Sequence, residues 1–316
     1  MTPLRAALIA VVGVTAGLGA TQNPPAVGRQ TGELRQEERS GLQVVDIYAC
    51  VRDQAGRIIN DLTREDFTVL DQGTPATVSV FAATTPPAAS VLLIDMGDNA
   101  VGKYHEVQDG ARRLVQNVAP DDRLRIETFG QEIALSPLLT NDKTTLLRVI
   151  DEELWPGGPA PVWLASRLAM NSLVLEKGRR VIIVWSLGHE TGHDNANCPQ
   201  SNTTRDAKPL ACVTANDVRE LARSGRFGIY AIGPDPSKMD NDLVRIVDES
   251  GGGVFDTGHD ADVAAAVDGL ADELRHQYVL GFIPAVRDGR IHQLEITVNR
   301  PGATVRARRT FVAEDK

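Results

Sequence analysis

The sequence predicts an α/β fold. A Rossmann-like, doubly wound, mostly parallel sheet is expected, with a flanking small β-sandwich module built from N-terminal and C-terminal strands. Two apolar runs, at residues 91–94 and 181–184, are typical of parallel strands buried on both faces. Strand and helix patterns alternate between residues 90 and 275, and only strand patterns occur on either side.

Length and composition narrow the classes of function. The chain of 316 residues is long enough to bury a large core and a smaller second one. Its net charge of −9 argues against a nucleic-acid partner. An aromatic content of 4% argues against a stacking surface for single strands or sugars.

Residues 1–20 have the pattern of a secretion signal peptide. Arg5 precedes an apolar run at residues 6–14, and small residues extend the run to Ala20. The run is too short for a comfortable membrane span, although a buried N-terminal helix is an alternative. We therefore expect a secreted or periplasmic protein with no membrane span in the mature chain. Residues 21–40 are polar and are expected to be a disordered lead-in.

Three cysteines occur, and export permits disulfides. Cys198 and Cys212 lie in one polar segment, residues 195–213, which needs a cross-link to hold a shape. The preferred disulfide is therefore Cys198–Cys212, among three possible pairings. Cys50 lies in an apolar strand pattern and is expected to be a buried free thiol.

Residues 41–85 form the N-terminal half of the predicted β module. Residues 42–52 alternate in hydrophobicity and predict a strand, and residues 61–66 predict a short helical turn. Residues 67–70 and 76–81 predict a hairpin whose turn is at residues 71–73.

Residues 89–275 form the predicted α/β domain. Its elements follow from apolar periodicity and from capping residues, such as Asn141 or Asp142 at the start of one helix. Strands are expected at residues 91–95, 123–129, 132–138, 180–185, 226–232 and 253–256, and helices at residues 101–118, 142–153, 161–175, 215–224, 238–250 and 260–275.

Residues 277–314 form the C-terminal half of the β module. Strands are expected at residues 277–283, 291–299 and 304–312, separated by turn signals. Neither half has enough strands to be stable alone, so we expect the two halves to pair into one sandwich.

Two motifs in the β module resemble a known family. The first is Asp61-Leu62-Thr63-Arg64-Glu65-Asp66-Phe67, followed by Ser79-Val80-Phe81, and the second is Tyr278-Val279-Leu280-Gly281-Phe282 with His292. They resemble the VWFA-related domain family of secreted bacterial proteins, over roughly residues 42–312. The resemblance implies a von Willebrand factor type A domain that binds partners and is not an enzyme.

Type A domains commonly bind a divalent cation at an Asp-x-Ser-x-Ser motif after the first strand, with a Thr and an Asp from later loops. Asp95 matches, but Gly97 offers no side-chain oxygen. The Thr position falls on Pro159 or Ala160, and the Asp position is Leu187. Mg²⁺ needs a near-octahedral oxygen cage, so no metal or other cofactor is expected.

We interpret this region as a degenerate adhesion site that binds a protein partner without a metal. Asp95 is expected to hydrogen-bond loop amides and to hold the turn in shape. The alternative is a divalent-dependent adhesion domain with Mg²⁺ or Ca²⁺ at Asp95 and Asn99. The candidate binding residues of the site and its rim are Asp95, Gly97, Asp98, Asn99, Ala160, Leu187, His189 and Glu190.

His189, Glu190 and His193 form an H-E-x-x-H motif, the signature of zinc peptidases. That chemistry needs both histidines on one helical turn. Here the motif follows a strand directly and contains Gly192, which is typical of a loop. A zinc-dependent hydrolase is therefore kept only as an alternative, and no catalytic residue is assigned.

The predicted function is protein binding, adhesion-like or scaffold-like, through loops at the carboxyl edge of the sheet. These loops are residues 96–102, 155–162 and 187–212, of which the long third loop is the candidate for partner specificity. Trp155 and Trp163 flank the second loop. Core packing is the expected role of both, and exposure as a partner anchor is the alternative.

Overall fold

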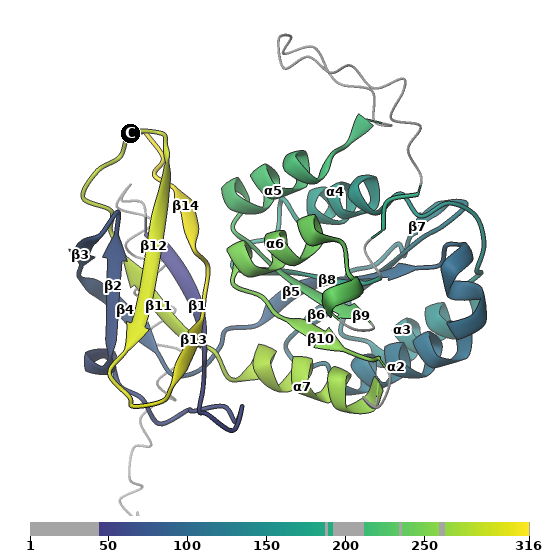
Figure 1. Ribbon diagram of the computed structural model, residues 1–316. Helices are drawn as coiled ribbons and strands as arrows, with labels where there is room; N and C mark the ends of the chain where they lie inside the picture. The colour runs from purple at the N-terminus through teal and green to yellow at the C-terminus, as the bar shows by residue number, and fades with distance from the viewer. Residues whose placement is uncertain (1–43, 187–188, 192–211, 234–235, 259–262, 316) are drawn as a thin grey trace, which may run out of the picture.

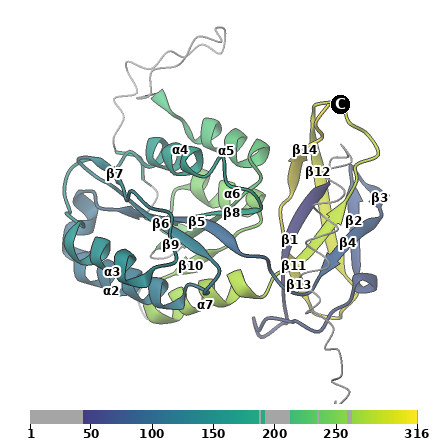
Figure 2. The same ribbon diagram turned by 180° about the vertical axis from the view of Figure 1, so that it is seen from behind.

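The computed structural model describes residues 44–186, 189–191, 212–233, 236–258 and 263–315. The expected signal peptide and lead-in lie outside these residues. The chain forms two lobes side by side, an α/β lobe and an all-β lobe (Figures 1 and 2).

The α/β lobe is built on a six-stranded sheet. All neighbouring strands are parallel except for the edge pair of β6 and β7. The central strand β5 is buried at every residue except Asp95 at its carboxyl end. The order across the sheet is β10(Val254–Asp256), β9(Phe227–Gly233), β8(Arg179–Trp185), β5(Ala88–Asp95), β6(Arg123–Phe129) and β7(Ile133–Leu135).

Helices cover both faces of this sheet, which confirms the doubly wound fold (Figure 1). Successive residues of β5 point to opposite faces, so Leu92 packs in one apolar core and Leu93 in the other. The first core lies under α2(Tyr104–Asn117), α3(Lys143–Glu152) and α7(Val263–Arg275), and the second under α4(Val162–Ser172), α5(Ala215–Ser224) and α6(Asn241–Ser250). The 3-10 turns η2(Asp98–Lys103) and η5(Pro236–Lys238) precede α2 and α6.

The all-β lobe is the predicted sandwich of N-terminal and C-terminal strands. Aromatic and aliphatic residues of both four-stranded sheets share one core, in which Phe67, Tyr278 and Phe311 are buried. The turn η1(Arg64–Asp66) leads into the second sheet. One sheet has the order β13(Thr304–Arg306), β1(Val45–Arg52), β11(Tyr278–Phe282) and β4(Val78–Ala82), and the other β14(Thr310–Val312), β12(Ile291–Val298), β2(Phe67–Asp71) and β3(Thr74–Ala76).

Two predicted strands of the sandwich are each divided in the structure. The segment 304–312 forms β13 in one sheet and β14 in the other, because the chain crosses between the sheets at residues 307–309. The Arg309 N–H donates to the Glu249 carbonyl in the other lobe at the crossing. The predicted strand 76–81 is divided in the same way. Its start belongs to β3, which forms a hairpin with β2, and the rest forms β4, which pairs with β11 in the other sheet.

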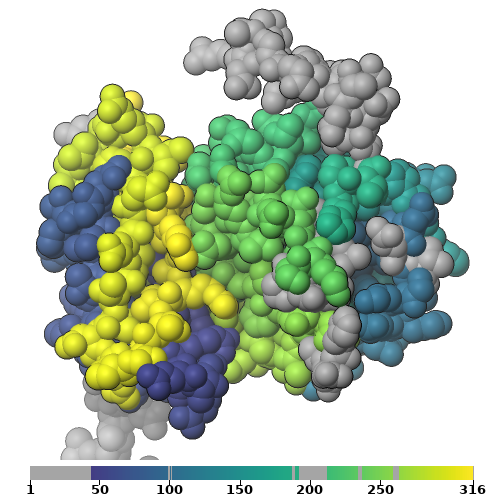
Figure 3. Space-filling view, viewed as in Figure 1, coloured from purple at the N-terminus to yellow at the C-terminus, as the bar shows by residue number. Residues whose placement is uncertain are grey.

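A buried carboxylate fastens the two lobes together. The Glu273 side chain on α7 is fully buried and forms ion pairs with Arg52 of β1 at 2.8 Å and Arg306 of β13 at 2.7 Å. The C-terminal strands, yellow in the space-filling view, lie directly against the green α/β lobe (Figure 3). Both arginines keep part of their surface in water, so the penalty of burying charge falls mainly on Glu273.

We predict that Glu273→Gln destabilises the protein by about 2–4 kcal/mol, because two guanidinium groups lose their counter-ion at a largely buried position. Urea unfolding of wild type and variant measures the change. The matched control is Glu152→Gln, which removes an exposed i,i+4 ion pair with Arg148 and is expected to cost about 0.5 kcal/mol or less. Equal losses in the two variants would contradict the prediction.

Glu127 of β6 is a second buried carboxylate, and neither of its oxygens has a hydrogen-bond partner. Burial raises the pKa of Glu127 from 4.5 to about 8, and the charge of Arg125 opposes the rise. Folded Glu127 therefore holds a proton that the unfolded side chain loses near pH 4.5. The contribution of protonated Glu127 to the free energy of unfolding is fully present below pH 4.5 and is lost as the pH rises through about 8.

Replacing Glu127 with glutamine mimics the protonated side chain. We expect Glu127→Gln to match wild type in stability near pH 4.5 and to exceed it by about 2–4 kcal/mol near pH 8, because only wild type must then bury an unpaired charge. Denaturant unfolding at both pH values measures the difference between the two proteins. A difference that stays constant with pH would contradict the assignment.

Candidate functional site

The candidate site lies at the carboxyl edge of the sheet, where β5 ends between β6 and β8. The chain leaves β5 toward β6 on one side and returns to β8 on the other, so this point is the topological switch of the sheet. Ligands of open α/β sheets bind outside the strand ends at such a point. Residues 96–98, 156–161 and 189–191 form its described loops.

Asp95, at the end of β5, uses both carboxylate oxygens inside the protein. The Ser186 hydroxyl donates to Oδ2 at 2.6 Å, and the Gly97 N–H donates to Oδ1 at 2.9 Å. Burial raises the pKa of Asp95, and these two hydrogen bonds oppose the rise. The bond from Gly97 is the contact expected from the sequence, and Ser186 is a partner that sequence analysis did not identify.

The space around Gly97 is filled by the neighbouring loop. A Cβ atom at this position would lie 2.9 Å from Ala160 Cβ and 3.3 Å from the Gly158 carbonyl oxygen. A serine in place of Gly97, as in the metal-binding motif, would therefore clash with backbone and with Ala160. The described residues do not fit an octahedral cation here, because Ala160 brings a methyl group where an oxygen is needed.

Hydrogen bonds join the first and second loops. The Asp98 N–H donates to the Gly158 carbonyl at 2.9 Å, and the Gly158 N–H donates to the Asp98 carboxylate at 2.7 Å. The Gly157 N–H donates to the Met96 carbonyl at 2.7 Å. Gly158 has φ +85° and approaches Gln131 too closely for any side chain.

The third loop is joined to the second in the same way. The Ala160 N–H donates to Thr191 Oγ1 at 2.7 Å, and the Thr191 N–H donates to the Ala160 carbonyl at 3.2 Å. Glu190 Oε2 accepts the Trp163 N–H at 3.1 Å and so satisfies a free donor at the start of α4. We call these three joined loops the platform.

The zinc-peptidase alternative lacks its helix in the described part of the motif. His189, Glu190 and Thr191 are not helical, and His193 lies outside the described residues. His189 is exposed, and the Glu190 carboxylate accepts a hydrogen bond from backbone. Within the described part of the chain, no group of three or more His, Cys, Asp or Glu side chains is arranged to hold a metal ion.

The structure thus brings Asp95, Gly97, Asp98, Ala160 and Glu190 together around the platform, and places His189 exposed beside it. Asn99 lies in η2, and its side chain is outside what the structure describes; Leu187 is also outside the described residues.

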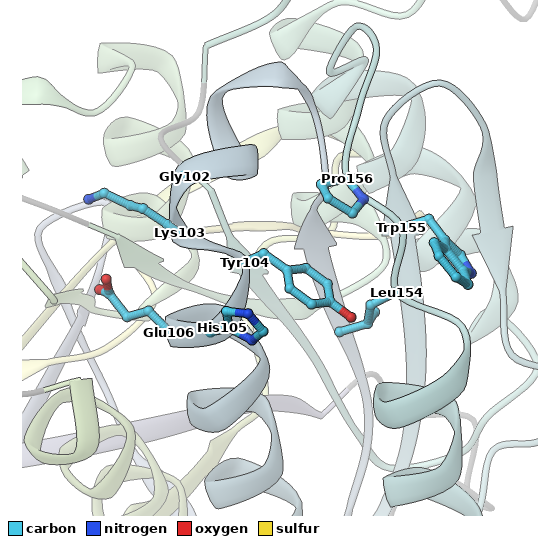
Figure 4. Close-up of a pocket in the computed structure, with 8 residues that line it drawn as sticks. All are labelled: Gly102, Lys103, Tyr104, His105, Glu106, Leu154, Trp155 and Pro156. Atoms are coloured by element: carbon cyan, nitrogen blue, oxygen red, sulfur yellow. The ribbon is translucent and has the colours of Figure 1, made fainter.

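A hollow of about 520 Å³ lies beside the platform (Figure 4). Trp155 is 79% exposed at its rim, whereas Trp163 is 6% exposed and packs in the core. The expectation of core packing is therefore confirmed for Trp163 and wrong for Trp155. The hollow is lined by Gly102, Lys103, Tyr104, His105, Glu106, Leu154, Trp155 and Pro156.

A local signal in the sequence accounts for the exposure of Trp155. The residue lies three positions after the last residue of α3 and is followed by Pro156, Gly157 and Gly158. Gly157 and Gly158 both have positive φ, so the chain turns sharply and holds the indole away from the core.

The cysteine predictions are tested only in part. Cys50 is a buried free thiol, as expected, and burial raises its pKa to about 12. Cys212 is buried and is not among the free cysteines, but Cys198 lies outside the described residues. The pairing of Cys198 with Cys212 therefore stays a prediction. The described helices include none with the length and apolar character of a membrane span.

No family model and no curated protein significantly matches the sequence. Solved structures do match in fold. The vWF domain of the type V pili tip protein Mfa5 from Porphyromonas gingivalis is 15% identical, with a TM-score of 0.48 over 60% of this chain and 95% of that one. A von Willebrand factor type A structure from Catenulispora acidiphila is 10% identical, with a TM-score of 0.45 over 86% of this chain and 75% of that one.

Proximal thread matrix protein 1 from the mussel byssus is 13% identical, with a TM-score of 0.46 over 63% of this chain and 49% of that one. Two of these three matches are to von Willebrand factor type A domains, and the chain is similar to them.

Proposed function

We propose that this protein is a non-enzymatic, secreted or periplasmic binding protein that holds a protein partner at the platform and the adjacent hollow, without a divalent cation. The single observation that carries the proposal is the exposure of Trp155. Its indole is 79% in solvent at the edge of the sheet where type A-like folds present their loops.

An exposed tryptophan beside a hollow is the usual chemistry of a protein interface. Tryptophan is enriched among the residues that contribute most to binding, and such residues cluster near pockets with a polar rim. In Figure 4 the Tyr104 ring and Leu154 lie in the middle of the hollow, Trp155 lies on one side of them, and Lys103 and Glu106 project on the other side. Apolar and charged groups thus lie within one surface.

The joined loops support a preorganised surface. In type A domains a bound ion commonly ties the loops together, and here backbone hydrogen bonds between Asp98 and Gly158 and between Ala160 and Thr191 join them. A surface that is already ordered loses less conformational entropy on binding. The partner therefore need not supply a carboxylate to complete a metal site.

The long loop after β8 belongs to the same proposal. Residues 187–212 begin beside Ser186 and end at Cys212 before α5. We propose that a Cys198–Cys212 disulfide in the exported protein shapes this loop and that it contributes to the choice of partner.

The proposal predicts that Trp155→Ala weakens partner capture at least tenfold, since loss of a central interface tryptophan commonly costs about 2 kcal/mol or more. The measurement is quantitative capture by immobilised protein from a periplasmic extract, followed by titration of the captured partner. Leu175→Ala is the matched control, because Leu175 is 91% exposed between α4 and β8, at the opposite edge of the sheet. Equal capture by all three proteins would contradict the proposal.

Metal independence is tested separately. We expect the melting temperature of purified protein to be the same in EDTA, MgCl₂, CaCl₂ and ZnCl₂, because Asp95 already accepts hydrogen bonds at both oxygens and Ala160 fills the cradle. A cation-dependent rise that disappears in Asp95→Ala would contradict this expectation. One that disappears in His189→Ala would instead favour zinc at the H-E-x-x-H motif.

A further inference from the structure

The boundary between the two lobes contains a cluster of arginines around a small cavity. The cavity lies at the amino ends of β8 and β9, on the side of the sheet opposite the platform, and we call it the seam cavity. Its volume is about 20 Å³, which is enough for one water-sized body, since a water needs roughly 10–15 Å³. Arg179, Arg180, Arg226 and Arg308 line it, together with Asp46 and Tyr48.

Positive charge exceeds negative charge around this cavity. Asp46 is the single carboxylate among its lining residues, against four guanidinium groups. Tyr48 stays neutral, because burial and the charge of Asp46 raise its pKa. Nearby, Glu314 lies 3.3 Å from Arg226 and is 57% exposed. Glu249 forms its shortest ion pair with Arg223, at 2.7 Å.

Three of the four arginines have partners among the described residues, but only Arg226 has a carboxylate partner. Arg179 donates to the Leu274 carbonyl and to Gln277 Oε1, and its guanidinium lies 5.3 Å from the centre of the Tyr48 ring. Arg226 lies between Asp46, at 3.5 Å, and Glu314. Arg180 donates to the Val174 carbonyl at 3.5 Å and lies 4.9 Å from the centre of the Phe227 ring. Arg308 is the member of the four whose guanidinium has neither a hydrogen-bond partner nor an ion pair among the described residues.

Arg308 is the group that most needs an additional partner. It lies where the chain crosses between the two sheets of the sandwich, and the residue is only 6% exposed. Its Nη1 atom is buried with no hydrogen-bond partner, and the same holds for Nε of Arg180. Leaving a buried charged donor unsatisfied costs several kcal/mol, so native structures rarely do so. The Arg308 backbone leaves no room for a Cβ atom at Gly251, the residue that ends α6.

We propose that the seam cavity binds a small monovalent anion, chloride in physiological media, and that this ion joins the sandwich to the α/β lobe. The cavity has room for a monatomic ion and is too small for a phosphate with its four oxygens. The ion would accept N–H bonds from Arg308 and Arg180 and reduce the repulsion among the arginines. Its lining residues lie on β1, β8, β9 and the crossing between β13 and β14, so bound anion would stabilise the association of the lobes.

The first experiment compares melting temperatures in sodium chloride and in sodium gluconate at equal ionic strength. Gluconate is too large for the cavity, so general screening is matched and only site binding differs. Wild type is expected to melt about 2–4 °C higher in chloride. Arg308→Met is expected to lose this difference. The control Arg64→Met, at an exposed arginine of η1, is expected to keep it.

The second experiment is a crystal of the wild-type protein grown in sodium bromide. An anomalous bromide peak within hydrogen-bond reach of Arg308 supports the proposal. Only a water at that place, or equal melting of wild type in both salts, overturns it. If Arg308→Met fails to fold, Arg180→Met takes its place, and a chloride effect that persists in that variant also overturns the proposal. Neither experiment involves a protein partner, so the result is independent of the proposed binding function.

Discussion

The lack of space for a side chain at Gly97 is the constraint on which the rest of the site depends. A Cβ atom there would lie 2.9 Å from Ala160 Cβ, so the loop after β5 and the loop before α4 pack closely and form hydrogen bonds between their backbones. Asp95 is left to accept hydrogen bonds from Ser186 and Gly97. Packing and hydrogen bonds among the described residues thereby hold the loops at the carboxyl edge of the sheet in place.

The two edges of the six-stranded sheet differ in the charge that each must satisfy. At the carboxyl edge, the half-buried carboxylate of Asp95 accepts hydrogen bonds from neutral donors. At the amino edge, several guanidinium groups share few carboxylates, while Glu273 nearby is enclosed by two arginines. The carboxyl edge thus carries the proposed binding surface, and the amino edge faces the all-β lobe.

The parts of the fold that depend on local pattern could be predicted from the sequence. The buried run of β5 and the Asp142 cap of α3 both lie where periodicity and capping placed them. The division of 304–312 into β13 and β14 could not be predicted, because it depends on the position of the other sheet and on a bond to Glu249. Ser186 and Arg308 were missed for the same reason: their partners are distant in the chain.

The topology of the sandwich has a consequence for synthesis. Strand β1 pairs with β11, and β2 with β12. The partner of each N-terminal strand is therefore synthesised more than two hundred residues later. Pairing at such separation is slow, and unpaired strand edges invite aggregation until the partner arrives. The α/β domain, complete within the intervening residues, can fold first and bring the two ends of the chain together. A chaperone that shields residues 45–82 during this interval would protect the step at which the molecule is most vulnerable.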